Sequence, residues 1–250
     1  MGSDSISGTN YKVFNRDVIK YIAMFTMLLN HIAHIFLPYG TVLYRLFEYI
    51  GYFTMPVMCF FLVEGYDYTR SKVKYGRRLL VFAVISQIPF SLAFHYGRLN
   101  MIYTLFCCFL ILTAMERIAN PFLKTLVGVL LMLATLVSDW ALFAPICTIL
   151  LYNGKGNPRK MAFGYGVVYV LFVVNNLESY LYGAQGIQVV YAIVCALCSG
   201  LGIIVAAVTV LLFYNGKRVE KGRNFSKWFF YLFYPAHLMI LYLIHVCVAG

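Results

Sequence analysis

Polar side chains lie within membrane-like apolar sequence near the start of the chain. His31 falls inside the apolar run 18–37, with Asn30 before it and His34 three residues after it. Ionisable residues inside a membrane span are costly, so they mark functional sites by default. A neutral imidazole can accept and return a proton near neutral pH, which makes His31 a candidate general base. The alternative is a structural role, in which the ring only bonds a neighbouring helix.

Three further ionisable residues stand at or near membrane depth. Glu64 ends an apolar run and begins a basic stretch, where it could serve a site or pair with an arginine of that stretch. Asp139 lies beside a tryptophan near the predicted outer face, where an aromatic residue is expected whatever the function. His237 follows a proline in the last apolar run, so it could serve the site or bond a carbonyl that the proline leaves free. We count all three as candidate catalytic residues.

The composition is that of a membrane protein. Of the 250 residues, 62% are hydrophobic and 12% charged, with a mean hydropathy of +0.79, whereas soluble proteins carry about 25% charged residues. The net charge of +11 is spread over short segments, with no basic soluble domain, so we expect no nucleic-acid partner. The spacing of histidine, cysteine and carboxylate residues is not typical of a metal site, so we also expect no metal.

The apolar runs predict an all-α polytopic bundle of about nine transmembrane helices. Most runs are near the roughly 20 residues that a bilayer requires, but 140–152 is short enough for a tilted or partial crossing. A glycine pair is a weak point in the long 187–214 run, where a break would reverse the last helix. A soluble tail is predicted over 1–17, without a signal peptide, and a single membrane domain over 18–250. The predicted spans are 18–38, 43–63, 79–95, 101–115, 121–138, 140–152, 161–175, 187–214 and 228–248.

Basic residues gather on alternate connections between these runs. Cations precede the first run and follow the second, fourth, sixth and eighth, while the other connections hold only Arg98. Positive charge favours cytoplasmic loops, so the N-terminus is predicted inside and the C-terminus outside. Much of this charge has a simple partner in membrane lipid headgroups. The loop 65–78 is an exception, because five cations in a short link could also bind the phosphates of a nucleotide cofactor.

Several stretches resemble the TraX family of polytopic membrane proteins, in the same order. They are KYIAMFTMLLNHIAHIF, the block RLFEYIGYFTMPVMCFFLVEGYDYTRSKVKYGRRLLVFAVISQIPF, the triplet SDW and the run FYLFYPAHLMILYLI. The family is named for a pilin N-acetylase and is related to the broader transmembrane acyltransferases. The resemblance covers nearly the whole chain and is strongest from Arg45 to Phe90.

The resemblance implies acyl transfer in the cytoplasmic membrane, in the first place of an acetyl group from cytosolic acetyl-CoA to an acceptor amine or hydroxyl. Lys20 and His31 match the spacing that marks a basic residue and the catalytic histidine in related membrane acyltransferases. The TraX pattern usually has aspartate before this histidine, where this chain has Asn30. An amide can orient an imidazole but cannot stabilise its charged form, so Asp139 or Glu64 is expected to supply that charge.

The implied donor site needs several cations at the cytoplasmic face, because CoA carries phosphates. The predicted set is Lys20, Arg45, Arg70, Lys74, Arg77 and Arg78. The acceptor stays open, since a pilin, a glycan, a lipid or a small amine would each suit a base at midplane. Two other classes also stay open. One is a transporter, whose midplane polar groups bind a solute or relay protons; the other is an accessory membrane protein with decayed catalytic ancestry, which Asn30 would support.

Overall fold

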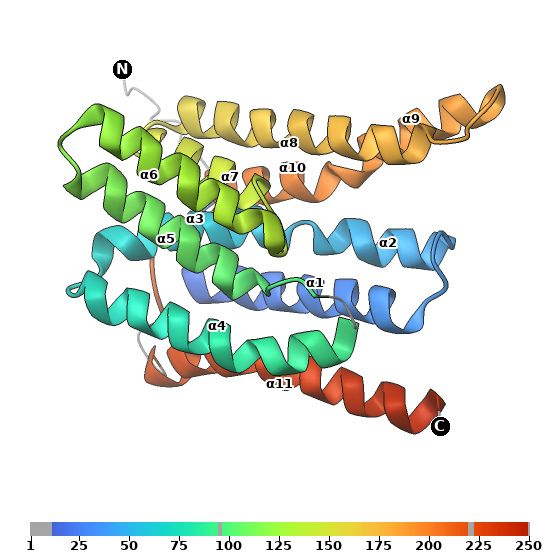
Figure 1. Ribbon diagram of the computed structural model, residues 1–250, viewed down its shortest axis with the longest axis horizontal. Coiled ribbons are helices and arrows are strands. Elements are labelled where there is room, and N and C mark those ends of the chain that lie inside the picture. Colours follow the sequence, from blue (N-terminus) through green and yellow to red (C-terminus); the bar gives the residue numbers. More distant parts are fainter. Residues whose placement is uncertain (1–11, 95–96, 220–222, 250) are drawn as a thin grey trace, which may run out of the picture.

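The computed structural model describes residues 12–94, 97–219 and 223–249, so residues 1–11 of the expected tail lie outside the described residues. The described residues form a bundle of α-helices whose axes run roughly in one direction (Figure 1), and they contain no β-strand. The helices are α1 Arg16–Phe36, α2 Val42–Gly51, α3 Thr54–Tyr68, α4 Lys72–Phe94, α5 Met101–Arg117, α6 Pro121–Ala134, α7 Phe143–Asn153, α8 Pro158–Leu181, α9 Ile187–Ser199, α10 Leu201–Val208 and α11 Arg223–Ala249. A 3₁₀ turn, η1 Thr135–Val137, follows α6, and a π-helical turn, η2 Thr209–Phe213, follows α10.

The helix lengths confirm a polytopic membrane protein. Within the described residues, six helical segments are long and apolar enough to cross a membrane, counting α2 with α3 and α9 through η2 as single segments. The remaining segments are α5, α6 with η1, and α7. At 1.5 Å per residue, the 11 residues of α7 rise about 16 Å, roughly half the thickness of the hydrocarbon core. The short run predicted over 140–152 is therefore too short to cross a bilayer by itself.

Asparagine side chains set the start of several helices. At each of these positions the side-chain oxygen accepts hydrogen bonds from two backbone N–H groups of the first turn. Such caps satisfy donors that the helix itself leaves unpaired. In α6 and α8 a proline follows the cap, in the first helical position that tolerates it. The capping residues are Asn15 for α1, Asn100 for α5, Asn120 for α6 and Asn157 for α8.

The predicted basic loop over 65–78 is wrong in its boundaries. Helix α3 continues to Tyr68 and α4 begins at Lys72, so only 69–71 connect them. Lysine and arginine are good helix formers, and their long stems can lie along apolar surface while the charge stays in water. The cations of this stretch therefore lie mostly on the first two turns of α4, where they point in different directions around the helix.

The two ends of the bundle differ in charge. The start of α1 and the end of α11 lie at opposite ends (Figure 1), and the connections α3–α4, α5–α6, α7–α8 and η2–α11 share the end where α1 starts. The start of α1 is tied there to the segment after η2, because Arg16 N–H donates to the Lys217 carbonyl at 2.9 Å and Val219 N–H to Asp17 Oδ2 at 2.9 Å. These are the cation-rich connections, so this is the end that the positive-inside rule predicts to face the cytoplasm.

Two glycines allow helices to meet closely. A Cβ at Gly51 of α2 would overlap the Asn30 side chain of α1, and a Cβ at Gly202 of α10 would lie 2.7 Å from the backbone of Tyr49 and Phe53. Helices α9 and α10 are separated only at Gly200, which has helical dihedrals, so they continue as one segment. The last helix therefore keeps its predicted direction.

We expect Gly202→Ala to lower the free energy of unfolding by about 1–3 kcal/mol, because the added methyl group overpacks against backbone that cannot move aside. Gly166→Ala in α8 is the matched control, since a Cβ there meets nothing within 4 Å. The measurement is thermal unfolding of both variants in detergent. Equal shifts in Tm would contradict close packing at Gly202.

Candidate active site

Two histidines from opposite ends of the chain meet in the interior. His31 of α1 and His237 of α11 are 206 residues apart in sequence, and His31 Nδ1 lies 2.7 Å from His237 Nε2. Both residues are buried. Their ring planes differ by 3° and their centroids are 5.0 Å apart, so with this short N···N distance the rings meet edge to edge. The two candidate residues therefore form one hydrogen-bonded unit.

A backbone carbonyl sets the direction of this hydrogen bond. His237 Nδ1 lies 2.7 Å from the carbonyl oxygen of Phe233, and a carbonyl can only accept. In the neutral pair, His237 Nδ1 carries the proton and Nε2 has the lone pair. His31 Nδ1–H must then donate to His237, which leaves the lone pair of His31 on Nε2. His237 thus bonds a backbone carbonyl, but this carbonyl belongs to Phe233, one turn before it, and is not the one that the proline leaves free.

His31 borders an outer cavity of about 780 Å³. The cavity is lined mainly by apolar and aromatic side chains, among which polar groups are few. Its polar and charged lining side chains include Asn30, His31, His34, Arg98 and Asp139. An apolar pocket with a few convergent polar groups is the usual form of a small-molecule or reactive site.

Asn30 supports this region from beside the histidine. Its Nδ2 donates to the backbone carbonyl of Glu48 at 3.2 Å, and the absence of a side chain at Gly51 allows α2 to approach it. The Glu48 side chain is buried. The Tyr44 hydroxyl links it to the imidazole of His34, because this hydroxyl lies 3.3 Å from Glu48 Oε1 and 2.8 Å from His34 Nδ1. Glu48 was not predicted as a site residue from the sequence. The only signal for it is that a charged residue lies within the stretch of strongest family resemblance, from Arg45 to Phe90.

Asp139 borders the outer cavity from a connection with unusual backbone geometry. Trp140 and Leu142 have φ angles of 57° and 60°, in the left-handed region that non-glycine residues rarely adopt. Thr104 Oγ1 donates to the Asp139 carbonyl at 2.6 Å, and Asp139 N–H donates to the Leu99 carbonyl at 2.8 Å. Backbone strain of this kind is kept mainly at functional sites. Burial raises the pKa of Asp139 to about 6.

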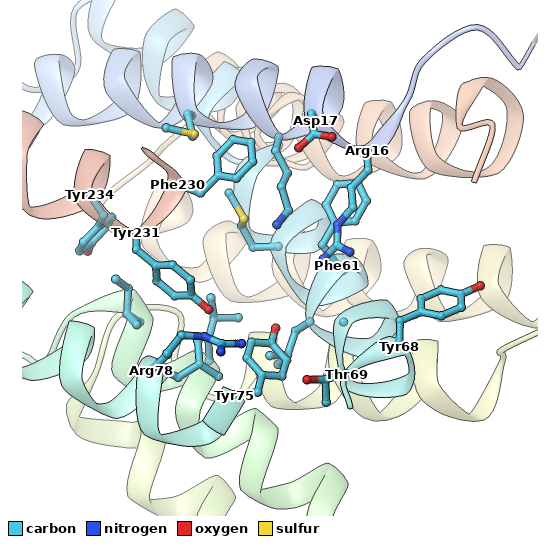
Figure 2. Close-up of a pocket in the computed structure, with 18 of the residues that line it drawn as sticks. Arg16, Asp17, Phe61, Tyr68, Thr69, Tyr75, Arg78, Phe230, Tyr231 and Tyr234 are labelled. Atoms are coloured by element: carbon cyan, nitrogen blue, oxygen red, sulfur yellow. The ribbon is translucent and has the colours of Figure 1, made fainter. Parts of the chain in front are cut away.

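A second cavity, of about 400 Å³, lies nearer the end of the bundle that holds the cation-rich connections. Figure 2 shows Arg78 between Tyr75 and Tyr231, with Arg16 and Asp17 on the α1 side. The cations that line this inner cavity are Arg16, Lys20, Arg70, Arg78 and Arg218. They come from α1, the α3–α4 connection, α4 and the segment after η2, so the fold gathers cations that are far apart in sequence.

Arg16 is a buried cation with a donor atom that has no hydrogen-bond partner among the described residues. Its Nε lies 3.6 Å from Glu64 Oε2, which is an ion pair, while Glu64 Oε1 accepts from Tyr214 hydroxyl at 2.5 Å. Arg16 is 6% exposed, yet its Nη1 has no hydrogen-bond partner among the described residues. Buried donors without partners are costly, so this atom points to an anionic or carbonyl ligand. Glu64 pairs here with α1, not with the basic stretch that follows it.

Lys20 lies one turn further along α1. Its Nζ is 5.5 Å from the ring centroid of Phe61 and 4.9 Å from that of Phe230. The two rings flank this amino group in the geometry of cation–π contacts, and the side chain lines the inner cavity.

The predicted donor cations separate into two groups. Lys20, Arg70 and Arg78 line the inner cavity, while Lys74 and Arg77 are exposed and line neither cavity. Arg45 is on α2, where Nη1 donates to the Tyr191 hydroxyl at 3.1 Å and to Cys195 Sγ at 2.7 Å. These contacts hold it against α9, away from the inner cavity. Arg16 and Arg218, which line that cavity, were read from the sequence only as topological charge.

Fold and site together define a polytopic α-helical membrane protein with a buried histidine pair beside an apolar outer cavity and a cationic inner one. The family model for the TraX protein matches residues 15–245, so the chain belongs to the TraX family. A similar protein is the "Probable fimbrial assembly protein FimC, serogroup H1" of Dichelobacter nodosus, which is 30% identical over 249 residues, covering 91% of this chain and 94% of the relative. No solved structure matches the chain.

Proposed function

We propose that this protein is a membrane-embedded acyltransferase that moves an acyl group from acyl-CoA to an amine or hydroxyl. The first acyl group to test is acetyl. The observation that carries the proposal is the chain from the Phe233 carbonyl through His237 to His31, which leaves a lone pair on His31 Nε2. A buried, oriented and neutral imidazole beside a cavity is suited to general base catalysis. Membership in the TraX family supports the same class of reaction.

The reaction balances without a covalent enzyme intermediate. The acceptor nitrogen or oxygen attacks the thioester carbonyl carbon while His31 Nε2 takes the acceptor proton. The C–S bond then breaks, and His31 Nε2 gives this proton to the leaving thiolate, which yields free CoA. His237 is the positioning residue, because it holds the His31 tautomer as a carboxylate does in a triad.

The inner cavity is the proposed donor site. Arg16, Arg78 and Arg218 can bind phosphate oxygens through guanidinium groups, which match phosphate geometry in a bidentate manner. Lys20 adds a hydrogen-bond donor deeper along α1. The cationic end of the bundle faces the cytoplasm, where acyl-CoA is available, if the protein lies in the cytoplasmic membrane as we propose. Membrane lipids surround the remaining apolar surface.

The outer cavity is the proposed acceptor site. It lies beyond His31 from the cations of the inner cavity, and its lining includes Arg98 and, in the strained connection, Asp139. A pilin, a glycan, a lipid or a small amine could each present a nucleophile there. The name of the Dichelobacter nodosus relative refers to fimbrial assembly, which makes a fimbrial subunit one acceptor to test.

A transporter is the second candidate function. Two cavities meet near the middle of the bundle, with His31 on the outer side and the cations on the inner side. This arrangement also suits a solute site reached alternately from two sides. A transporter would move a solute without cleaving acetyl-CoA, so release of free thiol from acetyl-CoA separates the two candidates.

We expect CoA to raise the Tm of the purified protein, because a ligand of the native state at about 100 times its Kd adds about 2.7 kcal/mol. Arg78→Ala should weaken CoA binding by roughly 10- to 100-fold, the value of a charged hydrogen bond. Arg77→Ala is the matched control, since this neighbour is exposed and lines neither cavity. Thermal shift titrations with CoA measure both. No stabilisation by CoA, or equal loss in the two variants, would contradict the donor site.

Asn30→Asp should give no gain in turnover, although it restores the usual residue of the family pattern. Asn30 Nδ2 donates to the Glu48 carbonyl, and a carboxylate cannot donate, so two oxygens would face each other. We expect a loss of about 1–3 kcal/mol of stability. Thermal unfolding and thiol release from acetyl-CoA test this in one preparation. A large rise in turnover would instead mean that His31 lacks a charged partner in the wild-type protein.

A further inference from the structure

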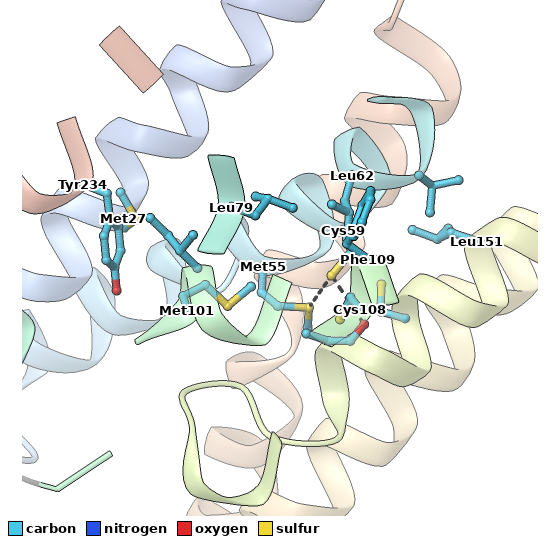
Figure 3. Packing of buried hydrophobic residues seen from close by; sticks show 14 of the residues in the cluster. Met27, Met55, Cys59, Leu62, Leu79, Met101, Cys108, Phe109, Leu151 and Tyr234 are labelled. Carbon is cyan, nitrogen blue, oxygen red and sulfur yellow. Dashed lines mark hydrogen bonds between the residues drawn. The ribbon is translucent and has the colours of Figure 1, made fainter. Parts of the chain in front are cut away.

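We infer that Met27, Met101 and Tyr234 form a wall between the two cavities and restrict the acyl group to a short chain. This inference rests on the proposed acyl transfer and names the determinants of acyl size. The three residues line both the inner and the outer cavity. They come from α1, α5 and α11, and Figure 3 shows them together at one end of the buried cluster.

The order of residues along α1 places this wall between the cations and the base. Arg16, Lys20 and Met27 line the inner cavity, whereas Met27 and His31 line the outer cavity. Met27 is one helical turn before His31 on the same face. From Lys20 to His31 the helix rises about 16 Å, at 1.5 Å per residue. When the phosphates of CoA bind these cations, the extended arm that ends in the thiol therefore points along α1 toward the wall.

The wall is closely packed and directly adjoins the reacting histidine. The exposed fractions of Met27, Met101 and Tyr234 are 9%, 7% and 5%. The Tyr234 ring centroid lies 6.2 Å from that of His31 and 5.7 Å from that of His237, in edge-to-face arrangements. An acyl group that reaches His31 from the inner cavity must therefore displace or pass these three side chains.

The reaction geometry then fixes where the acyl chain lies. The acceptor atom must come within about 3–3.5 Å of the thioester carbon, while His31 reaches the acceptor from the outer cavity. The thioester carbon is consequently at the wall, and the rest of the acyl group occupies the space between the methionines. Methionine is unbranched and adaptable, so it can move aside for a small group. A longer chain would overpack the same space.

The test is the acyl-length profile of purified protein. Thiol release is measured with acetyl-CoA, butyryl-CoA and octanoyl-CoA for wild type, Met27→Ala and Met101→Ala, each in the presence of a membrane extract that supplies acceptors and with the extract alone as background. We expect each variant to raise the octanoyl-to-acetyl rate ratio at least tenfold. Met115→Ala is the matched control, because this methionine is on α5 with Met101 but lines neither cavity. Its ratio should equal that of wild type.

The outcomes separate this inference from the proposed function. If wild type and all variants release thiol from acetyl-CoA with the same length profile, the wall does not select the acyl group and the inference is wrong. If wild type releases no thiol from any acyl-CoA, the proposed acyl transfer itself fails. The two methionines are on different helices, so one folded variant is sufficient to decide. Stabilisation of that variant by octanoyl-CoA in thermal unfolding gives a second readout, and its absence would also count against the wall.

Discussion

Replacing His31 by alanine should abolish acyl transfer while leaving CoA binding intact. The lone pair on His31 Nε2 is the base of the proposed reaction, and general acid–base groups contribute roughly 10²–10⁴-fold to a rate. The inner cavity does not include His31, so the variant should still gain stability from CoA. Thiol release from acetyl-CoA and the CoA-dependent Tm, measured on one preparation, test both statements.

His31→Gln is the companion variant, because it keeps a polar side chain in the buried site but has no titratable nitrogen. It should be as inactive as the alanine variant. Full activity in either variant would remove His31 from the chemistry. Loss of the folded protein in both would favour the structural role, in which the ring serves only to join α1 to α11.

Replacing His237 by leucine should have the second largest effect. His31 Nδ1–H then loses its acceptor at 2.7 Å, so neither the tautomer nor the ring orientation stays fixed. The loss of the corresponding partner in a serine-protease triad lowers kcat about 10⁴-fold, and we expect a fall of roughly 10²–10⁴-fold here. His237→Gln retains an oxygen that can accept from His31 and should recover at least tenfold relative to leucine.

The comparison of leucine with glutamine distinguishes positioning from packing. Both variants lose the histidine ring and its stacking on Phe233, whose centroid is 4.7 Å away. If His237 only fills space, the two variants should have similar rates and differ only in Tm. If it positions His31, turnover should be higher in the glutamine variant, which keeps a hydrogen-bond acceptor, than in the leucine variant, even where the two have the same Tm.

The membrane fold was predictable from sequence because hydrophobic length is a local property. Apolar runs mark spans, and alternating cations mark the sides of the membrane. Helix α4 begins seven residues before the predicted 79–95 run, because the cations there are helical too. Hydropathy reports where a chain leaves the membrane, whereas a helix can continue beyond that point with its charges in water.

The pairing of site residues was only partly predictable. His31 and His237 were each recognised as candidates, but the apolar pattern of the two runs that contain them does not say that these helices pack together. Similarly, Arg77 and Arg78 are neighbours in sequence, yet successive residues differ by about 100° around a helix, so only Arg78 lines the inner cavity. Arg16 was hidden because a cation before the first span already has a topological explanation.

The most direct test of acyl transfer uses membranes that retain their own acceptors. Membranes containing wild-type protein or His31→Ala at equal amounts are incubated with acetyl-CoA radiolabelled in the acetyl group, and the label is followed in protein, lipid, glycan and small-molecule fractions. We expect one fraction to gain label with wild-type protein and to stay at background with His31→Ala. Equal labelling of every fraction by the two proteins, or none above membranes that lack the protein, would contradict an acyltransferase centred on His31.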